Sequence, residues 1–169
     1  MVKKYASVTR WQRRAVSLQH YTAVELFHGA SASEARKISD LSSEKHFPQG
    51  GTIFCEGDPS NSLYILKNGV VRLISVSDKG SETILHILKP GEIFGELLLS
   101  REKRAFTALA SEDTVVTVVS RESFQKLLSL IPTLAFNFIQ VLSRRLAEVE
   151  EGLVESSHTW SYHRLANVL

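Results

Sequence analysis

The chain has 169 residues, of which 43% are hydrophobic, and its formal net charge is only +2. This length is enough for one medium-sized domain with a buried core and a few appended helices. No apolar run approaches the roughly 20 residues of a membrane-spanning helix, and no apolar segment of a secretory signal opens the chain. Cys55 is the only cysteine, which excludes an internal disulfide and a four-cysteine iron–sulfur cluster and predicts a cytoplasmic protein.

The first segment, residues 1–24, is a basic extension. It carries Lys3, Lys4, Arg10, Arg13 and Arg14. A DNA or partner contact is one interpretation of this segment, and a solvated tail is the favoured one. Residues 25–43 follow, where Ala35, Ile38 and Leu41 at helical spacing predict short helices.

From residue 45 onward, short apolar and β-branched runs alternate with glycine-containing turns. Strands are expected over residues 52–55, 63–66, 70–76, 82–88, 106–110 and 114–119. Strands at intervals of roughly eight to twelve residues predict a β-sandwich or barrel. A jelly roll fits this pattern best. The predicted fold is therefore mainly β with flanking helices, a double-stranded β-helix (jelly roll) followed by a long C-terminal helix.

Two helices are predicted after the last strand. Ser120 is expected to cap the first, with Glu122 in its first turn. The second lies within residues 131–157 and has apolar positions in alternating three- and four-residue steps, with Gly152 as a candidate hinge. So long an apolar stripe needs a partner, either a second subunit in a parallel twofold pair or the helix's own domain. The dimer interpretation is favoured, through Phe138, Val141, Leu142, Val149 and Leu153.

One short motif combines residues suited to binding an anion. It is Phe94-Gly95-Glu96-Leu97, followed by Arg104-Ala105. Gly95 would let the backbone approach a ligand without a Cβ atom, and a helical turn beginning near Glu96 would direct N–H groups at it. Arg104 would bind oxyanions through charge-assisted hydrogen bonds. Alternatively, Glu96 and Arg104 could pair with each other, because an unpaired buried charge is very costly.

Glycines recur at fixed places between Leu26 and Leu128. They are Gly57 in EGDP, Gly69 in KNG, Gly80, Gly91 in KPGE and Gly95 in FGE. In this order and spacing, the stretch resembles the cyclic-nucleotide-binding fold of the CRP/FNR family of bacterial transcriptional regulators. The resemblance implies a phosphate-binding cassette with Phe94, Gly95, Glu96, Leu97, Arg104 and Ala105 as ligand-binding residues. Glu96 would accept the ribose 2′-hydroxyl, Arg104 would bind phosphate, and cyclic AMP or cyclic GMP is the candidate effector.

The chain departs from the family pattern in three places, one of which is Ala105, where several cyclic-nucleotide binders carry a hydroxyl residue as an extra donor. The segment 97–103 is short and carries Arg101, Glu102 and Lys103. On the long helix, Val149 and Glu150 occupy the base-facing positions where the bacterial cyclic-AMP receptor places two hydroxyls against adenine. Three alternatives follow: a cyclic-nucleotide site with altered base recognition, a site for another small molecule, or an empty roll that acts as an oligomerisation module.

The last residues, 158–169, resemble the start of the family's winged helix-turn-helix domain. No recognition helix follows them, so contact with DNA is expected only in a full-length form. The predicted organisation is a basic extension over 1–24, a sensor roll over 25–130, a dimerisation helix over 131–157 and the beginning of a DNA-binding domain over 158–169. The predicted partners are a second copy, a small effector and, through the full-length protein, DNA, with no membrane.

Other chemistries have less support in the sequence. Metal-binding rolls use a His-x-His pair, and the six histidines form none. His86 or Cys55 as an axial haem ligand is the remaining cofactor alternative. No arrangement of catalytic residues is evident, so a non-enzymatic protein without a metal site is predicted.

Overall fold

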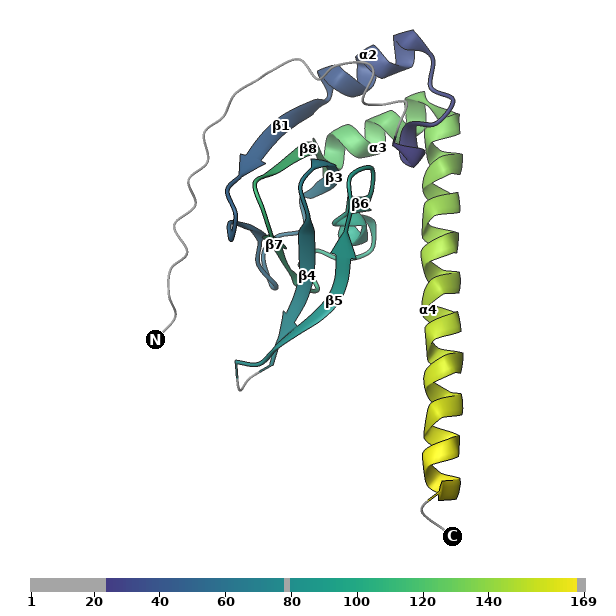
Figure 1. The fold of residues 1–169 in the computed structure, drawn as a ribbon. Coiled ribbons are helices and arrows are strands. Elements are labelled where there is room, and N and C mark those ends of the chain that lie inside the picture. Colours follow the sequence, from purple (N-terminus) through teal and green to yellow (C-terminus); the bar gives the residue numbers. More distant parts are fainter. Residues whose placement is uncertain (1–23, 78–79, 167–169) are drawn as a thin grey trace.

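The computed structural model describes residues 24–77 and 80–166, with side chains up to residue 153. The basic segment 1–23 and the side chains of 158–169 lie outside this part. A β-roll is covered by short helices at one end, and one long helix stands along its side (Figure 1).

Two four-stranded antiparallel sheets form the roll, with strand orders β1-β8-β3-β6 and β2-β7-β4-β5. The strands are β1 (Ser42–Phe47), β2 (Thr52–Phe54), β3 (Ser62–Asn68), β4 (Val71–Val76), β5 (Glu82–Leu88), β6 (Ile93–Phe94), β7 (Thr107–Ala110) and β8 (Thr114–Ser120). This arrangement confirms the predicted jelly roll with a long C-terminal helix.

Strand β3 shows where the core lies. Successive side chains of a strand point to opposite faces. Leu63 and Ile65 join the cluster beneath the helices, whereas Tyr64 and Leu66 join the cluster between the two sheets. All four are buried, so β3 is covered on both faces.

The helical elements surround one end of the roll. They are η1 (Glu25–Phe27), α2 (Ala32–Asp40), η2 (Glu96–Leu99), α3 (Arg121–Leu130) and α4 (Pro132–Ala166). Ser31 and Glu34 form a capping box at the start of α2. Ser120 caps α3 as predicted, because its hydroxyl accepts a hydrogen bond from the Ser123 N–H at 3.1 Å.

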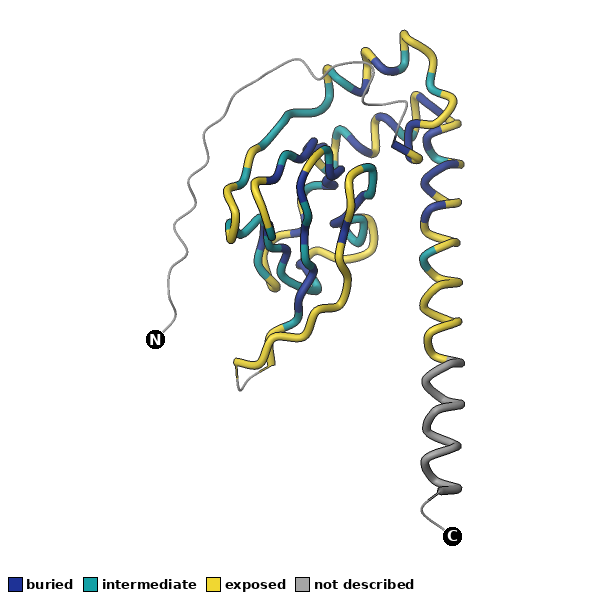
Figure 2. The backbone as a smooth tube through the Cα atoms, viewed as in Figure 1, coloured by how far each residue is buried: buried dark blue, intermediate teal, exposed yellow. Residues whose placement is uncertain are grey.

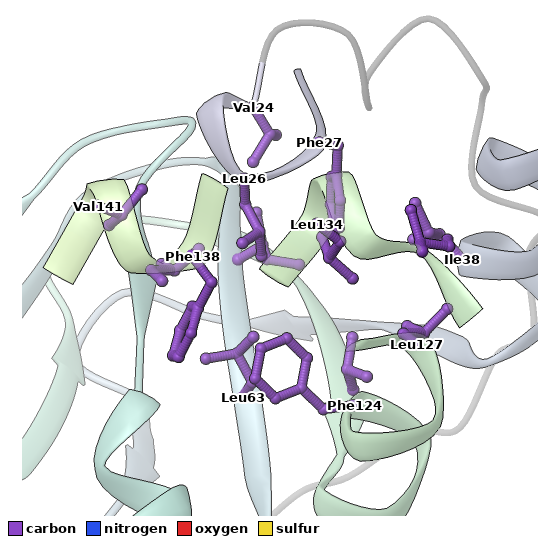
Figure 3. Packing of buried hydrophobic residues seen from close by; sticks show 14 of the residues in the cluster. Val24, Leu26, Phe27, Ile38, Leu63, Phe124, Leu127, Leu134, Phe138 and Val141 are labelled. Atoms are coloured by element: carbon purple, nitrogen blue, oxygen red, sulfur yellow. The ribbon is translucent and has the colours of Figure 1, made fainter. Parts of the chain in front are cut away.

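The first turns of α4 belong to the core of the roll domain. Leu134, Phe138 and Val141 pack beneath η1 and against α3 (Figure 3). The ring of Phe138 meets that of Phe124 edge-on, with 5.1 Å between centroids. Phe138 and Val141 are each only 5% exposed, so the structure corrects their assignment to a dimer face. Their spacing reflected packing on their own domain.

Further along, α4 leaves the roll and its side chains become exposed (Figure 2). The exposed apolar residues on its stripe are Ile139, Leu142, Leu146, Val149 and Leu153. The helix continues through Gly152 without a break and through residues 158–166, where the sequence resembles the start of a DNA-binding domain.

Within the described residues, no single helix has the length and composition of a membrane span. α3 and the first part of α4 reach that threshold only as a pair, bent by 114°.

Candidate functional site

The cassette begins where β6 ends. Gly95 follows Phe94 with a φ of 77°, in the left-handed region, and η2 starts at the next residue. The Leu98 N–H donates to the Gly95 carbonyl at 3.2 Å, so the N–H groups of Glu96 and Leu97 precede the first hydrogen bond of this turn. The helical turn expected near Glu96 is therefore present.

Glycine at position 95 is required by space as well as by backbone conformation. A Cβ atom there would lie 2.5 Å from Nη1 of Arg104 and 3.0 Å from the carbonyl oxygen of Ser62. The first distance is shorter than Cβ atoms show in proteins, and the second is tighter than most of their contacts. Gly95 therefore makes room for the guanidinium of Arg104, a reason that differs from the close ligand approach inferred from the sequence.

Arg104 points into the roll and is only 6% exposed. Its Nη1 donates to the carbonyl of Gly95 at 3.2 Å, and its Nη2 donates to the carbonyl of Ser62 at 2.7 Å. The guanidinium carbon lies 4.3 Å from the ring centroid of Phe54 and 5.3 Å from that of Tyr64. Two carbonyls and two aromatic faces thus surround the positive charge.

The charge of Arg104 has no acid paired with it. Among the residues that the structure describes, no carboxylate lies within salt-bridge distance of this guanidinium, and its Nε–H has no acceptor. Burial lowers the pKa of Arg104, and the nearby Tyr64, Asp58 and Glu96 oppose that shift. An arginine nevertheless stays protonated in proteins, so this is a buried cation without an ion-pair partner among the described residues.

The other charged cassette residue, Glu96, faces the long helix. Its Oε1 accepts a hydrogen bond from Nη1 of Arg145 at 2.9 Å, and Nη2 of Arg145 donates to the carbonyl of Ile93. Both side chains are largely buried, with 14% and 23% exposure. The Glu96–Arg104 ion pair that the sequence left open is therefore not formed.

Arg145 was not among the site residues predicted from the sequence. Leu134, Phe138, Val141 and Arg145 follow one another at four, three and four residues, so they share one face of α4. A charged residue at the next position of an otherwise apolar helical face was the signal in the sequence that could have identified Arg145 as a site residue.

The closing end of the cassette is tied to the turn that follows β2. The Gly57 N–H donates to the carbonyl of Arg104 at 3.0 Å, and the Arg104 N–H donates to the carbonyl of Asp58 at 2.8 Å. The Ser60 N–H donates to the carbonyl of Glu102 at 2.7 Å. The backbone of Arg104 is thus fixed on both sides, and Ala105 follows it, half-buried.

The remaining predicted site residues are spread over the structure. Phe94 is fully buried against Phe54 and Tyr64, and Leu97 is half-buried in η2. Val149 and Glu150 lie beyond Arg145 on the exposed part of α4, with Val149 60% exposed. The structure brings Phe94, Gly95, Glu96, Leu97, Arg104 and Ala105 into one region, and Val149 and Glu150 stand apart on the helix.

A cleft of about 250 Å³ lies beside this region, between α4 and the turn at residues 90–93. It shares Ile93 and Arg145 with the contacts of Glu96. Arg144, on its helical wall, forms an ion pair with Glu25 of η1.

The two residues considered as haem ligands lie on different parts of the roll. His86 lies on β5 and Cys55 directly follows β2, and these strands are the opposite edges of one sheet. Burial raises the pKa of the Cys55 thiol, and the charge of Asp58 adds to the shift. In residues 24–77 and 80–153, no three histidine, cysteine or acidic side chains group as metal ligands.

Known proteins share both the sequence and the architecture. The cyclic nucleotide-binding domain family matches residues 44–130. A cyclic AMP receptor protein from Thermus thermophilus is 36% identical over 145 residues, 85% of this chain and 67% of that protein. A CRP-like cAMP-activated global transcriptional regulator from Mycobacterium tuberculosis is 30% identical over 146 residues, 85% of this chain and 65% of that protein.

The crystal structure of the Thermus thermophilus catabolite activator protein has a TM-score of 0.71 at 36% identity, covering 79% of this chain and 63% of that one. The chain thus spans about two thirds of the length of these relatives. The predicted resemblance is confirmed: the chain belongs to the cyclic nucleotide-binding domain family and is related to transcriptional regulators of the CRP/FNR type.

Proposed function

We propose that this chain is the effector-sensing and dimerisation part of a CRP/FNR-type transcriptional regulator. Its roll binds a small anionic effector at the cassette, and a cyclic nucleotide is the effector proposed first. Only the full-length regulator would contact DNA, and the chain would act as a sensor without catalysing a reaction.

The observation that carries this proposal is the buried guanidinium of Arg104 without a paired acid. A vestigial roll would be expected to neutralise such a charge, because leaving it unpaired in the interior is destabilising. Here Glu96, an acidic residue of the cassette, is engaged by Arg145 instead. An anionic ligand would supply the missing counter-charge and an acceptor for the Nε–H.

A cyclic nucleotide matches the other groups of the cassette. Its phosphodiester is a singly charged anion suited to Arg104 and to the N–H groups of Glu96 and Leu97. Its ribose hydroxyl is a donor, and Oε2 of Glu96 forms no hydrogen bond with the described residues. Two relatives carry names that refer to cyclic AMP, which supports the same class of ligand.

The Glu96–Arg145 contact provides a route from the cassette to the long helix. An effector hydroxyl that binds Glu96 would share this carboxylate with Arg145 and change the balance of that contact. Because Arg145 belongs to α4, effector binding would shift the population of helix positions relative to the roll. Val149 and Glu150, further along α4, are proposed to meet the base when the helix closes on the ligand.

Dimerisation is proposed through the exposed stripe of α4. Its members Ile139, Leu142, Leu146, Val149 and Leu153 repeat at alternating three and four residues, which is the a/d pattern of a two-stranded coiled coil. These residues are 37–64% exposed in the single chain, so the stripe has apolar surface available for a second copy.

Calorimetric titration with cyclic AMP and with cyclic GMP tests the effector site. The native chain is expected to bind at least one of them, and Arg104→Leu is expected to weaken binding by about 100-fold, since a charge-assisted phosphate contact is lost. Leucine suits this buried position, so folding should be retained. Arg36→Leu, an exposed site on α2, is the matched control and should bind normally.

Two results would contradict the proposal at different levels. Absence of heat with both nucleotides would overturn the cyclic-nucleotide assignment and leave the site to another small anion. Undiminished binding by Arg104→Leu would overturn the site itself.

A further inference from the structure

Arg121, the first residue of α3, contacts the cassette loop from outside the cassette. Its Nη2 donates to two carbonyl oxygens, of Ser60 at 2.8 Å and of Arg101 at 3.1 Å. Its backbone N–H donates to the carbonyl of Asn61 at 2.8 Å. One residue therefore joins the start of α3, the turn before β3 and the loop of the cassette.

We propose that Arg121 is a positioning residue that sets the place of the Arg104 guanidinium. This inference rests on the proposed role of Arg104 as the anion receptor. Arg121 would touch no ligand, and its effect would pass through the backbone carbonyls that it holds.

Three consecutive carbonyls connect the two arginines. Arg121 binds the carbonyls of Ser60 and Asn61, and Arg104 binds the carbonyl of Ser62 at 2.7 Å. Because neighbouring peptide units are rigid planes, a displacement at Ser60 or Asn61 moves the acceptor of Arg104. The Ser62 hydrogen bond, at 2.7 Å, is the shorter of the two that the guanidinium donates to backbone carbonyls of the described residues.

A second connection runs through the cassette loop itself. The Arg101 carbonyl is bound by Arg121, and the next residue, Glu102, accepts the Ser60 N–H at 2.7 Å. Arg104 then donates its own N–H to Asp58. The loop and the turn therefore form two facing segments, and Arg121 bonds to both at their open end.

The chemistry favours arginine at this position. Both N–H bonds of one guanidinium nitrogen are used, and the planar group fixes the angle between them. A lysine ammonium lacks this fixed geometry, and a glutamine side chain is shorter. The side chain is half-buried, which limits competition by water.

The first test observes Arg104 directly in the ligand-free protein. The Nε–H resonance of Arg104 in ¹⁵N–¹H NMR is assigned by its loss in Arg104→Leu. Arg121→Gln is expected to shift this resonance while the rest of the amide spectrum stays folded. Lys126→Gln, which removes the same charge from an exposed site of α3, should leave it in place. An unmoved resonance in folded Arg121→Gln would overturn the inference.

The second test is a double-mutant cycle on the affinity for cyclic AMP. Arg121→Gln is expected to weaken binding about tenfold when Arg104 is present and to have little effect in an Arg104→Lys background. Equal losses in both backgrounds would mean a purely structural role and would overturn the inference. If the native chain binds cyclic GMP instead, the cycle is run with that nucleotide. If it binds neither, the proposed effector fails, whereas the NMR comparison still decides the role of Arg121.

Discussion

The environment of Arg104 consists of dipoles and aromatic rings. The carbonyls of Gly95 and Ser62 offer partial negative charge, and the faces of Phe54 and Tyr64 add a weaker attraction. These groups replace part of the lost hydration, but they leave the full positive charge in place. Because screening is weak in the interior, an anion that reached this guanidinium would be bound strongly.

Gly95 provides a test of this packing. Gly95→Ala adds a Cβ atom 2.5 Å from Nη1 of Arg104, in addition to a side chain at positive φ. We expect a loss of about 3 kcal/mol in the free energy of unfolding, measured by urea denaturation. The matched control is Gly50→Ala, which has the same φ of 77° but no atom within 4 Å of the new Cβ. It should lose only about 1 kcal/mol. Equal losses would show that Arg104 moves aside freely.

The sequence predicted those parts of the candidate site that depend on neighbouring residues. Gly95 and Arg104 belong to a compact motif, and the helical turn after Gly95 follows from that motif. The partner of Glu96 did not follow, because Arg145 is 49 residues away and only the packing of α4 brings it there. Long-range ion pairs depend on tertiary structure, which spacing along one segment does not specify.

Among the strands, the two that the sequence missed are those with the weakest local signal. Strand β1, Ser42–Phe47, is mostly polar, yet all six of its residues pair with β8. Strand β6 has two residues and forms because they pair with Tyr64 and Ile65. The long apolar runs of β3 and β8 were predictable, since burial on both faces requires continuous hydrophobicity. Strands β1 and β6 form because they pair with strands that are distant in the sequence, and local sequence does not reveal such pairing.

One ion pair crosses the sheet between β1 and β3 and gives a pH-dependent stability. Burial raises the pKa of Glu44, but Lys67 and His46 outweigh it, so the net pKa lies below its usual value. A lowered pKa in the folded state stabilises the fold above the unfolded value, near 4.5, and this stabilisation is lost as the pH falls through the folded pKa.

We therefore expect Glu44→Gln to cost about 2 kcal/mol in the free energy of unfolding at pH 7, because it also leaves Lys67 unpaired. The cost should shrink as the pH falls below 4.5, because the unfolded chain then binds a proton that the folded chain takes up only at its own, lower pKa. Urea unfolding at pH 7 and pH 3.5 measures both values. Glu112→Gln removes an exposed carboxylate and should cost little at either pH. A pH-independent cost for Glu44→Gln would contradict this assignment.

Asn137 connects η1 to α4. Its side-chain amide donates to the carbonyls of Leu26 at 3.1 Å and of His28 at 2.8 Å, and the residue is only 7% exposed. Asn137→Leu removes both donors and leaves two carbonyls without them, which should cost about 2–3 kcal/mol. Thermal unfolding measures the loss. Gln140→Leu, on the exposed side of the same helix, is the control. A loss no larger than that of the control would mean that hydrophobic packing alone holds η1.

At the scale of the whole molecule, α4 carries two apolar stripes with different partners. Leu134, Phe138 and Val141 face the roll, and the stripe from Ile139 to Leu153 faces outward. Both follow steps of three and four residues, so the sequence pattern merged them into one predicted interface. The two stripes can be told apart only by which of them faces the roll, and the position of the roll is not visible in the sequence of the helix. The outward stripe continues beyond the last contact with the domain, which makes a second copy its proposed partner.

Self-association of the chain should therefore depend on one face of α4. Leu146 is 60% exposed on the outward stripe, and Ala147 is turned away from it by about 100° on the helix. Sedimentation velocity over a concentration series should show a dimer for the native chain. Leu146→Glu should weaken dimerisation by about 100-fold, because two charges would meet at the twofold axis without partners. Ala147→Glu introduces the same charge one residue away and should leave the dimer intact. A native monomer at high concentration, or equal weakening by both variants, would contradict pairing of two copies through this stripe, because such pairing buries Leu146 and leaves Ala147 outside the interface.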